Sequence, residues 1–434
     1  MKLHYYPTKL LFLLLTMTQP VNSLANEIRT SDSEKTISSA QLVAAVLQAN
    51  PRLEVAQATW QASVARVEQQ SALDDPQFHY SFAPITIDSQ KSDFGQRFEI
   101  SQNVPFPGKL HLRGKVAEYE AETNQENITI LQLLLATSAK SLFADSYFNH
   151  QAIAINRVNQ TLLVEFHDIA LTRYSTGRTS KQDVLRAEVE QARLKHQAIV
   201  LQRERKTLRA QLNTLLNRTL ETPFPVPQKL PEITDLPDLE QLQIKAIQSR
   251  PELKAIAARI NASKTQSELA ALAYYPDLKL SAGYNSLWDN EDKRFNIGVS
   301  INIPLNQDKR QAAEHEASAN SQQVHWRKID LKARISEELA VAYAHAEESL
   351  HVLRLYRQQL APLAVENLAA AKADYQAGKG DFLTLISSEK NWLQTQLKTE
   401  QALADVHRRV AVLEQAVGIL EPMLTADKAG RIVK

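Results

Sequence analysis

Residues Phe295 to Leu305 read FNIGVSINIPL, and apolar residues occupy every second position through Ile303. This period of two is typical of a β-strand with one apolar and one polar face. The residues around the stretch are rich in Ala, Gln, Glu and Lys, and they predict long helices. The fold therefore depends on what the apolar face of this strand contacts in a mainly helical protein.

The chain contains the same plan twice. ANPRLEVAQA is similar to SRPELKAIAA, and RYSTGRTSKQDVLRAE is similar to DYQAGKGDFLTLISSE. Four pairs of landmarks recur at offsets of 199 to 201 residues: Pro51 and Pro251, Pro76 and Pro276, Pro105 and Pro304, Gly177 and Gly378. Two tandem copies are too few for a solenoid, so they predict a duplicated half.

Each copy is expected to contain a helix, two alternating strands, a very long helix, a tip with a glycine, and a return helix. The first helices are expected over 39–72 and 239–272, the long helices over 109–173 and 308–374, and the return helices to Leu216 and Gly418. About 65 helical residues make a rod of roughly 100 Å. Pro362 is expected to kink the second rod. Its predicted seam is Leu339, Ala342, Ala346, Leu350, Leu353, Leu360, Ala364 and Leu368.

The strands allow two interpretations: an ordinary sheet with one face on a soluble core, or part of a membrane barrel. Their expected length of about 10 residues suits a tilted membrane strand, which favours the barrel. Four strands cannot close a barrel and lipid does not tolerate an open edge, so several chains would have to share one. The residues expected to face lipid are Phe78, Tyr80, Phe98, Ile100, Leu278, Leu280, Ile297, Val299 and Ile301.

The composition and the two ends of the chain narrow the class of protein further. The 434 residues carry a formal net charge of +1, which gives no indication of nucleic-acid binding, and no cysteine. The N-terminus is basic and then apolar, which predicts an export signal cleaved near Ala25. No later segment is expected to approach the apolar length of a membrane helix. The predicted division is an export signal (1–25), a first repeat (26–216), a proline-rich linker (217–238), a second repeat (239–420) and a C-terminal tail (421–434).

The export signal, the duplicated plan and the tip sequences together resemble the outer-membrane efflux protein (TolC-like) family. YRQQLAPLAVENLAAAKADYQAGKGDFLTLISSE is the most specific stretch, and NVPFPGKL resembles the heavy-metal efflux (CzcC-like) branch. The resemblance implies a mainly α fold with a membrane β-barrel: a homotrimer with 12 strands in outer-membrane lipid and a long α-helical periplasmic tunnel. It also implies a passive duct without cofactor or catalysis, which works with a periplasmic adaptor protein and an inner-membrane resistance-nodulation-division-type transporter.

The tips carry the candidate sites. Gly177 and Gly378 are expected to supply left-handed turns at helix ends. Residues at the tips that are candidates for adaptor docking or gating are Tyr174, Gly177, Arg178, Tyr375, Gly378, Lys379 and Asp381. Some relatives carry acidic residues six and nine positions past the second tip glycine, as charged rings at the tunnel entrance. By this resemblance Thr384 and Ser387 are entrance candidates here, with Asp183 six positions past Gly177.

Other kinds of site receive no support from the sequence. The 11 histidines are scattered and form neither H-x-H nor H-E-x-x-H, so no metal site is expected. No nucleophile with a base, phosphate-binding glycine loop or carboxylate pair occurs at a meaningful spacing, so no enzyme is expected. Two alternatives to an efflux duct stay open: an outlet for protein secretion, and an exported helical scaffold with soluble hairpins.

Overall fold

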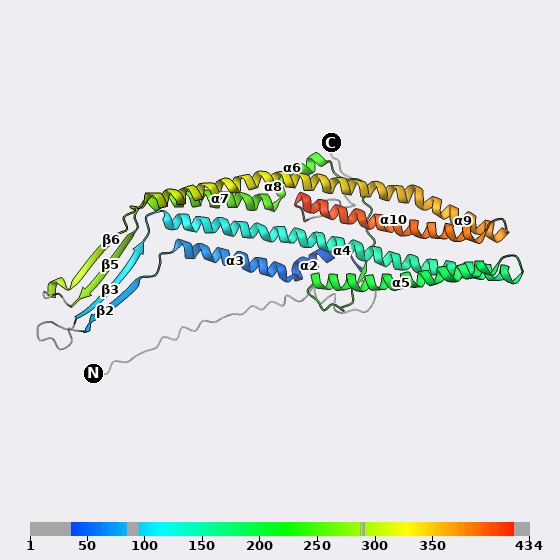
Figure 1. Cartoon of the computed structure of the whole chain (residues 1–434), viewed down its shortest axis with the longest axis horizontal. Coiled ribbons are helices and arrows are strands. Elements are labelled where there is room, and N and C mark those ends of the chain that lie inside the picture. Colours follow the sequence, from blue (N-terminus) through cyan, green and yellow to red (C-terminus); the bar gives the residue numbers. More distant parts are fainter. Residues whose placement is uncertain (1–35, 85–94, 287, 289–290, 421–434) are drawn as a thin grey trace.

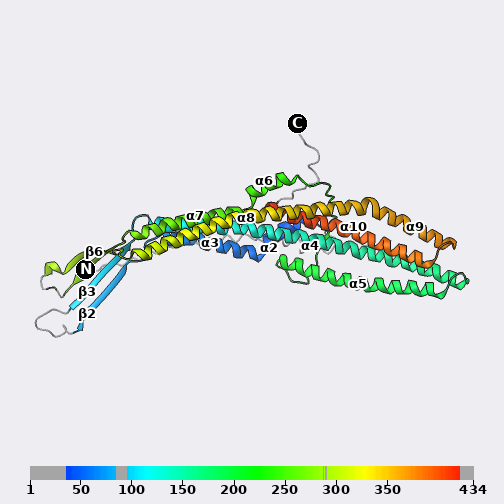
Figure 2. The ribbon, with the colours of Figure 1, turned by 45° about the horizontal axis from the view of Figure 1, so that its top comes forward.

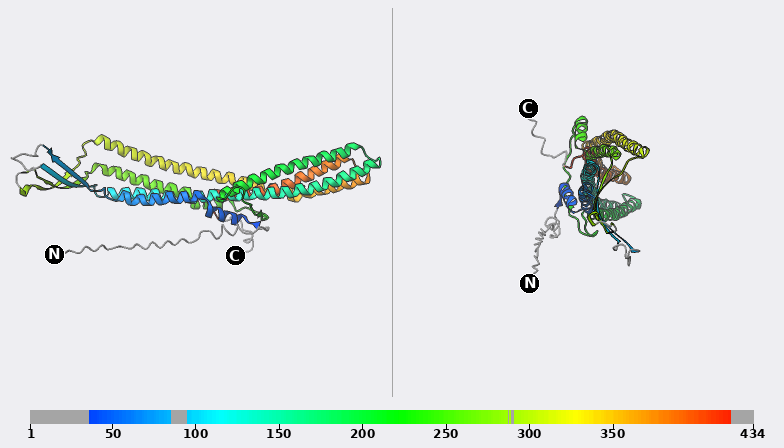
Figure 3. Two further views of the ribbon diagram at one scale, coloured as in Figure 1. Left: turned by 90° about the horizontal axis from the view of Figure 1, so that it is seen from below. Right: turned by 90° about the vertical axis from the view of Figure 1, so that its left-hand side faces the viewer.

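The chain forms a long helical rod with a small sheet at one end and two helical tips at the other (Figure 1). The computed structural model describes residues 36–84, 95–286, 288 and 291–420. The expected export signal, the loop between the first two strands and the C-terminal tail lie outside these residues. Figure 2 and the left view of Figure 3 show the same elongated shape from other sides, with the sheet projecting beyond the helices.

The two copies have matching elements. In the first copy these are α2 (Ser39–Ala49), α3 (Pro51–Ser71), β2 (Gln77–Ala83), β3 (Gly95–Val104), α4 (Lys109–Ser175) and α5 (Lys181–Leu215). In the second copy they are α6 (Leu239–Ser249), α7 (Pro251–Ala271), β5 (Leu278–Asn285), β6 (Phe295–Ile301), α8 (Gln307–Leu355), α9 (Ala361–Ala377) and α10 (Phe382–Val417). The long helices and the return helices end within a few residues of their predicted bounds.

The first helix of each copy is broken, and the prediction of one continuous helix in each was wrong. Asn50 and Arg250 have extended backbone between two helices, with ψ of 119° and 117°. Each precedes a proline, Pro51 or Pro251, whose ring disfavours helical backbone in the residue before it. Proline then opens the next helix, where its missing N–H group has no cost.

The second long arm is interrupted by a π-helical turn, Tyr356–Leu360, directly before Pro362. Proline lacks the N–H group for an intrahelical bond and its ring meets the carbonyl four residues earlier, so the helix departs from α geometry there. Most of the predicted seam is buried, from Leu339 to Leu353 and again at Ala364. Leu360 is exposed, because the wider turn changes the phase of the apolar face.

Helix α4 is the central element of the rod, since it packs against α2, α3, α5, α7 and α10. One 18-residue stretch of α4 is apolar enough, by length and composition, to cross a membrane. The prediction that no segment beyond the export signal reaches this apolar length was therefore wrong. A helix with neighbours on several sides needs apolar residues on more than one face.

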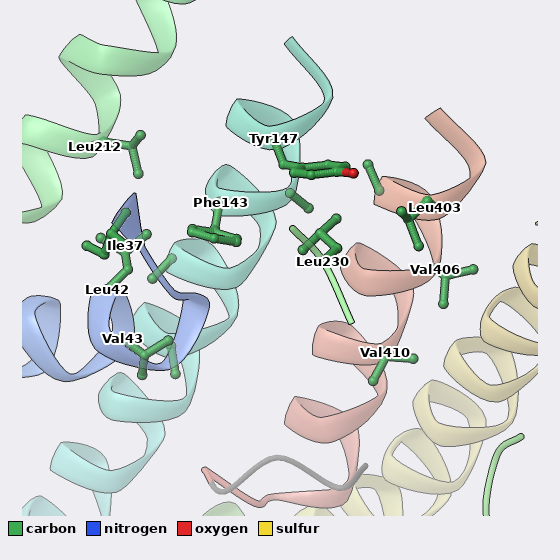
Figure 4. Packing of buried hydrophobic residues seen from close by; sticks show 14 of the residues in the cluster. Ile37, Leu42, Val43, Phe143, Tyr147, Leu212, Leu230, Leu403, Val406 and Val410 are labelled. Carbon is green, nitrogen blue, oxygen red and sulfur yellow. The ribbon is translucent and has the colours of Figure 1, made fainter. Parts of the chain in front are cut away.

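The largest core lies near the middle of the rod, where both copies and the linker meet (Figure 4). Phe143 and Tyr147 of α4 lie between Leu42 of α2 and Leu403 of α10, and Leu230 joins them from the linker. The linker forms no helix, as its prolines predict. Its short strand β4 (Val226–Pro227) pairs in parallel with β1 (Thr36–Ile37), a contact that the sequence analysis did not predict.

Candidate functional site: the exposed sheet and the helical tips

The four long strands form one antiparallel sheet in the order β2-β3-β5-β6. The hairpin of each copy is local, and the pairing of β3 with β5 joins the two copies. Within the described residues β2 and β6 are paired on one side only. The sheet therefore has two open edges that can pair with further strands.

The register places apolar side chains from all four strands on one face. One row across the sheet is Phe78, Ile100, Ala282 and Ile297, and the next is Tyr80, Phe98, Tyr284 and Phe295. Gln102, opposite Leu280, interrupts the apolar face, and its amide donates to the carbonyl of Asp74 at 2.7 Å. All nine residues expected to face lipid are exposed in the single chain, and Ile297 reaches 90%.

The opposite face of the sheet is polar. His79, Glu99, Gly283 and Asn296 form one row, and Asn103, Lys279 and Ser300 form another. Glu99 accepts a hydrogen bond from Arg97 at 2.5 Å. An apolar face and a hydrated face on the same four strands are the two surfaces that a strand between lipid and a water-filled lumen requires.

Three of the strands are shorter than the ten residues expected, with seven, eight and seven residues for β2, β5 and β6. Strand β6 ends at Ile301, so Ile303 and Leu305 of the FNIGVSINIPL stretch lie beyond it. Beyond the strand, the Asn302 side chain accepts from the Asp277 backbone at 2.5 Å, and Pro304 has no N–H group to donate to a neighbouring strand.

The two tips have the same backbone. Gly177 and Gly378 both adopt left-handed conformations, with φ of 72° and 77°. At the first tip the N–H of Gly177 donates to Tyr174 O at 3.0 Å and that of Arg178 to Arg173 O at 2.8 Å. The equivalent bonds at the second tip, from Gly378 and Lys379, measure 3.1 and 2.9 Å. This pairing satisfies carbonyls at the helix end and requires a residue that tolerates positive φ.

The tyrosines that precede the two glycines have different environments. Tyr174 is 43% exposed, whereas Tyr375 is 2% exposed and packs against Phe382. The guanidinium of Arg173 lies over the Tyr375 ring at 4.7 Å and donates to the Tyr375 carbonyl. Burial and the nearby charge of Asp183 raise the pKa of the Tyr375 hydroxyl, while Thr179 lowers it. The two tips are thus fastened to each other through Tyr375.

Sequence reasoning missed Arg173 and Thr179. Arg173 joins the tips, and the Thr179 hydroxyl donates to Asp183. A signal for Arg173 existed in the repeat, because the equivalent position in the second copy is Asp374. A change of charge between two otherwise similar tips marks a position where the copies have different neighbours. Thr179 offers no such signal, since Thr is common beside turns.

The remaining tip candidates are exposed, except Asp183, which is partly buried against Thr179. Asp381 is the N-cap of α10, and its carboxylate accepts from the Thr384 N–H at 2.7 Å. This bond and the Thr384 side chain lower the pKa of Asp381. Thr384 and Ser387 lie one turn apart on the exposed side of α10, and Arg178 and Lys379 are exposed beside the glycines. No group of three His, Asp or Glu that could hold a metal ion occurs among the described residues.

Comparison with known proteins identifies this architecture. Residues 242–419, nearly the whole second copy, match the family model described as outer membrane efflux protein. The cobalt-zinc-cadmium resistance protein CzcC of Cupriavidus metallidurans is 20% identical over 340 residues, which cover 77% of this chain and 79% of CzcC. The pyoverdine export outer membrane protein OpmQ of Pseudomonas aeruginosa is 21% identical over 392 residues, covering 87% of this chain and 78% of OpmQ.

Solved structures share the fold over almost the whole chain. The structure of CusC has a TM-score of 0.76 at 17% identity and covers 89% of this chain and 93% of its own. The outer membrane protein VceC of Vibrio cholerae has a TM-score of 0.74 at 16% identity, covering 88% and 97%. With the sheet, the rod and the duplicated tips in place, these matches show that the second copy is similar to the outer membrane efflux protein family and that the chain has the fold of TolC-like outer-membrane channels.

Proposed function

We propose that three copies of this chain form the outer-membrane duct of a tripartite efflux system. Each chain contributes four strands to a 12-stranded barrel and its helices to a periplasmic tunnel. A periplasmic adaptor protein connects the duct to an inner-membrane resistance-nodulation-division-type transporter, which supplies the energy. The duct itself is passive and carries no catalytic site. Heavy-metal cations are the proposed cargo.

The observation that carries the proposal is the sheet with an exposed apolar face and two open edges. A soluble scaffold would leave the nine apolar side chains of this face in water, without a covering layer. In lipid the same face is favourable, but each open edge would leave backbone N–H and C=O groups unsatisfied. Pairing β2 of one copy with β6 of the next satisfies both edges and closes the barrel.

A second feature supports assembly between copies. Helix α5 carries large apolar side chains on its outer surface, among them Leu185, Val189 and Ile199, and each is about half or more exposed in the single chain. A neighbouring copy would cover them, as subunit interfaces cover apolar surface. The tunnel and the barrel would then be held together by the same threefold arrangement.

The barrel is tested by two substitutions on adjacent residues. Val299→Arg places a charge on the apolar face, where a lipid-facing arginine near the middle of the bilayer costs about 2–4 kcal/mol. Ser300→Arg places the same charge on the polar face and serves as the matched control. We expect crosslinking in mild detergent to stop at three chains for the wild type and for Ser300→Arg, and trimer yield to fall for Val299→Arg. A monodisperse wild-type monomer, or equal loss from both substitutions, would contradict the barrel.

At the other end, we propose that the tips form the tunnel entrance and the adaptor docking surface. Thr384 and Ser387 are the proposed constriction, with Asp183 near it on the first tip. Replacing both Thr384 and Ser387 with Asp should raise cation selectivity in planar-bilayer recordings and strengthen block by multivalent cations. Unchanged selectivity and block would show that these side chains lie away from the narrowest point.

The cargo proposal rests on the similarity to CzcC, whose name states cobalt, zinc and cadmium resistance. A strain that lacks this chain should become sensitive to those cations and recover with the wild-type gene. Normal metal tolerance together with loss of a secreted protein would instead support the secretion outlet. OpmQ, named for pyoverdine export, is similar to the chain at nearly the same identity, so pyoverdine export is a useful third assay.

A further inference from the structure

A cavity of about 280 Å³ lies near the middle of the rod, between α4, α5 and the linker. Asn149 and His150 line it from α4, and the linker closes one side with Pro223–Pro227. Helix α5 contributes three cationic side chains, from Arg205, Lys206 and Arg209. Arg205 and Arg209 are four residues apart, so they lie one above the other on the same helix face.

The charge of this cavity is not balanced by the protein. None of its lining residues is Asp or Glu. Among the described residues, no carboxylate forms an ion pair with any of the three cationic side chains. Elsewhere on α5, by contrast, Arg193 pairs with Glu190 at 2.8 Å and Arg203 with Glu204 at 3.4 Å. Two of the other three arginines of α5 therefore have a carboxylate partner, whereas none of the three cationic side chains of the cavity has one among the described residues.

Two local observations describe the surroundings of the cationic side chains. The Nε atom of Arg209 is buried and has no hydrogen-bond partner among the described residues, which is unfavourable for a charged donor. Burial lowers the pKa of His150, and the charges of Arg205 and Arg157 lower it further. A neutral imidazole at this position can donate or accept a hydrogen bond without changing the local charge.

We propose that this cavity binds a small anion that carries a phosphate or carboxylate group. The guanidinium groups of Arg205 and Arg209 offer paired N–H donors that match two oxygens of either group, and Lys206 adds a third positive charge. The site lies far from the tips and the sheet, and it does not depend on which cargo the duct carries.

The full-length chain in detergent is titrated with orthophosphate and with citrate, each in a low-salt buffer without other multivalent anions. The test variant is Arg205→Gln with Arg209→Gln. The matched control is Arg203→Gln, on the same helix but outside the cavity. We expect saturable binding by the wild type, unchanged binding by the control, and affinity at least about tenfold weaker for the double variant. Binding of one probe alone identifies its anionic group as the ligand chemistry.

A second measurement separates loss of the site from loss of the fold. Hydrogen exchange of the segment 223–227 and of α5 should slow when the wild type binds its anion, and the double variant should show no such change. If the double variant does not fold, Arg205→Gln alone replaces it, because that side chain is exposed. Absence of wild-type binding to both probes, or equal weakening by Arg203→Gln, would overturn the proposal.

Discussion

The two return helices, α5 and α10, occupy equivalent places in the duplicated plan but have different surroundings. Six of the 35 residues of α5 are buried, compared with 16 of the 36 residues of α10. Helix α5 packs mainly on α4 at the edge of the bundle, whereas α10 packs against α4, α8 and α9 (Figures 1 and 2). The duplication preserves the backbone, and the neighbours decide how much of each helix is core.

Equivalent positions show the difference residue by residue. Lys181, Leu185 and Glu188 of α5 are exposed. Their counterparts 201 positions later are Phe382, Ile386 and Glu389, and all three are buried. A helix surrounded on several sides needs a wider apolar face than one at the edge, so the second copy has Phe where the first has Lys. Glu389 is the polar exception, and the Asn159 side chain donates to its carboxyl group.

The largest effect is expected from truncating the buried tyrosine. Tyr375→Ala removes a fully buried ring and leaves a cavity, which costs about 3–5 kcal/mol for a large aromatic residue. Tyr174→Ala, at the equivalent exposed position, should change stability by less than about 0.5 kcal/mol. The rate of hydrogen exchange at the tip amides measures the loss of stability in each of the two variants. A similar loss of protection from hydrogen exchange in the two variants would show that the two tyrosines stabilise their tips equally.

A smaller effect is expected at the contact that joins the tips. Arg173→Gln removes the guanidinium from the Tyr375 ring and weakens the bond to the Tyr375 carbonyl, together about 1–2 kcal/mol. Arg178→Gln, at the exposed side of the same tip, is the control. We expect faster exchange at the second tip only for the first variant. If exchange there stays slow, the two hairpins are held together without this contact.

The buried carboxyl group of Glu389 in α10 predicts a pH dependence of stability. Burial raises the pKa of Glu389, and Glu190 adds to the shift, so the folded chain favours the neutral form. Its stabilising contribution is present below the ordinary pKa of a glutamate and is lost as the pH rises through the raised value. Glu389→Gln should raise the thermal midpoint at pH 8 and leave it unchanged at pH 4. Glu188→Gln should change neither, and a gain at both pH values would contradict this assignment.

The smallest effect is expected at the helix starts. Asp381 caps α10, whereas Ser180, its counterpart at α5, makes no side-chain cap bond. Asp381→Ala should therefore speed exchange at Thr384 more than Ser180→Ala does at the start of α5. Because the cap lowers the pKa of Asp381, its contribution is present above the ordinary value and is lost as the pH falls through the lowered one. Asp381→Asn should keep the cap and remove this pH dependence.

Most of the architecture could be predicted from short-range patterns. Local backbone geometry leaves a visible pattern in the sequence. Examples are the alternation around Val299, the glycines at 177 and 378, and the spacing of the repeated landmarks. The breaks at Asn50 and Arg250 were missed although both precede a visible proline. The burial of Tyr375 but not Tyr174 could not be predicted, because both sit in similar local sequence and only the packing of α4, α5 and α10 distinguishes them.

The π turn at Tyr356–Leu360 also has a consequence for how the duplicated halves diverged. Seventy-two positions separate Pro105 from Gly177, but seventy-four separate Pro304 from Gly378. The second arm is therefore longer in sequence, yet both tips lie at the same end of the rod (Figure 3). A π turn takes up an additional residue without ending the helix. The π turn beside Pro362 can therefore accommodate one of the two additional positions of the second arm without ending the helix.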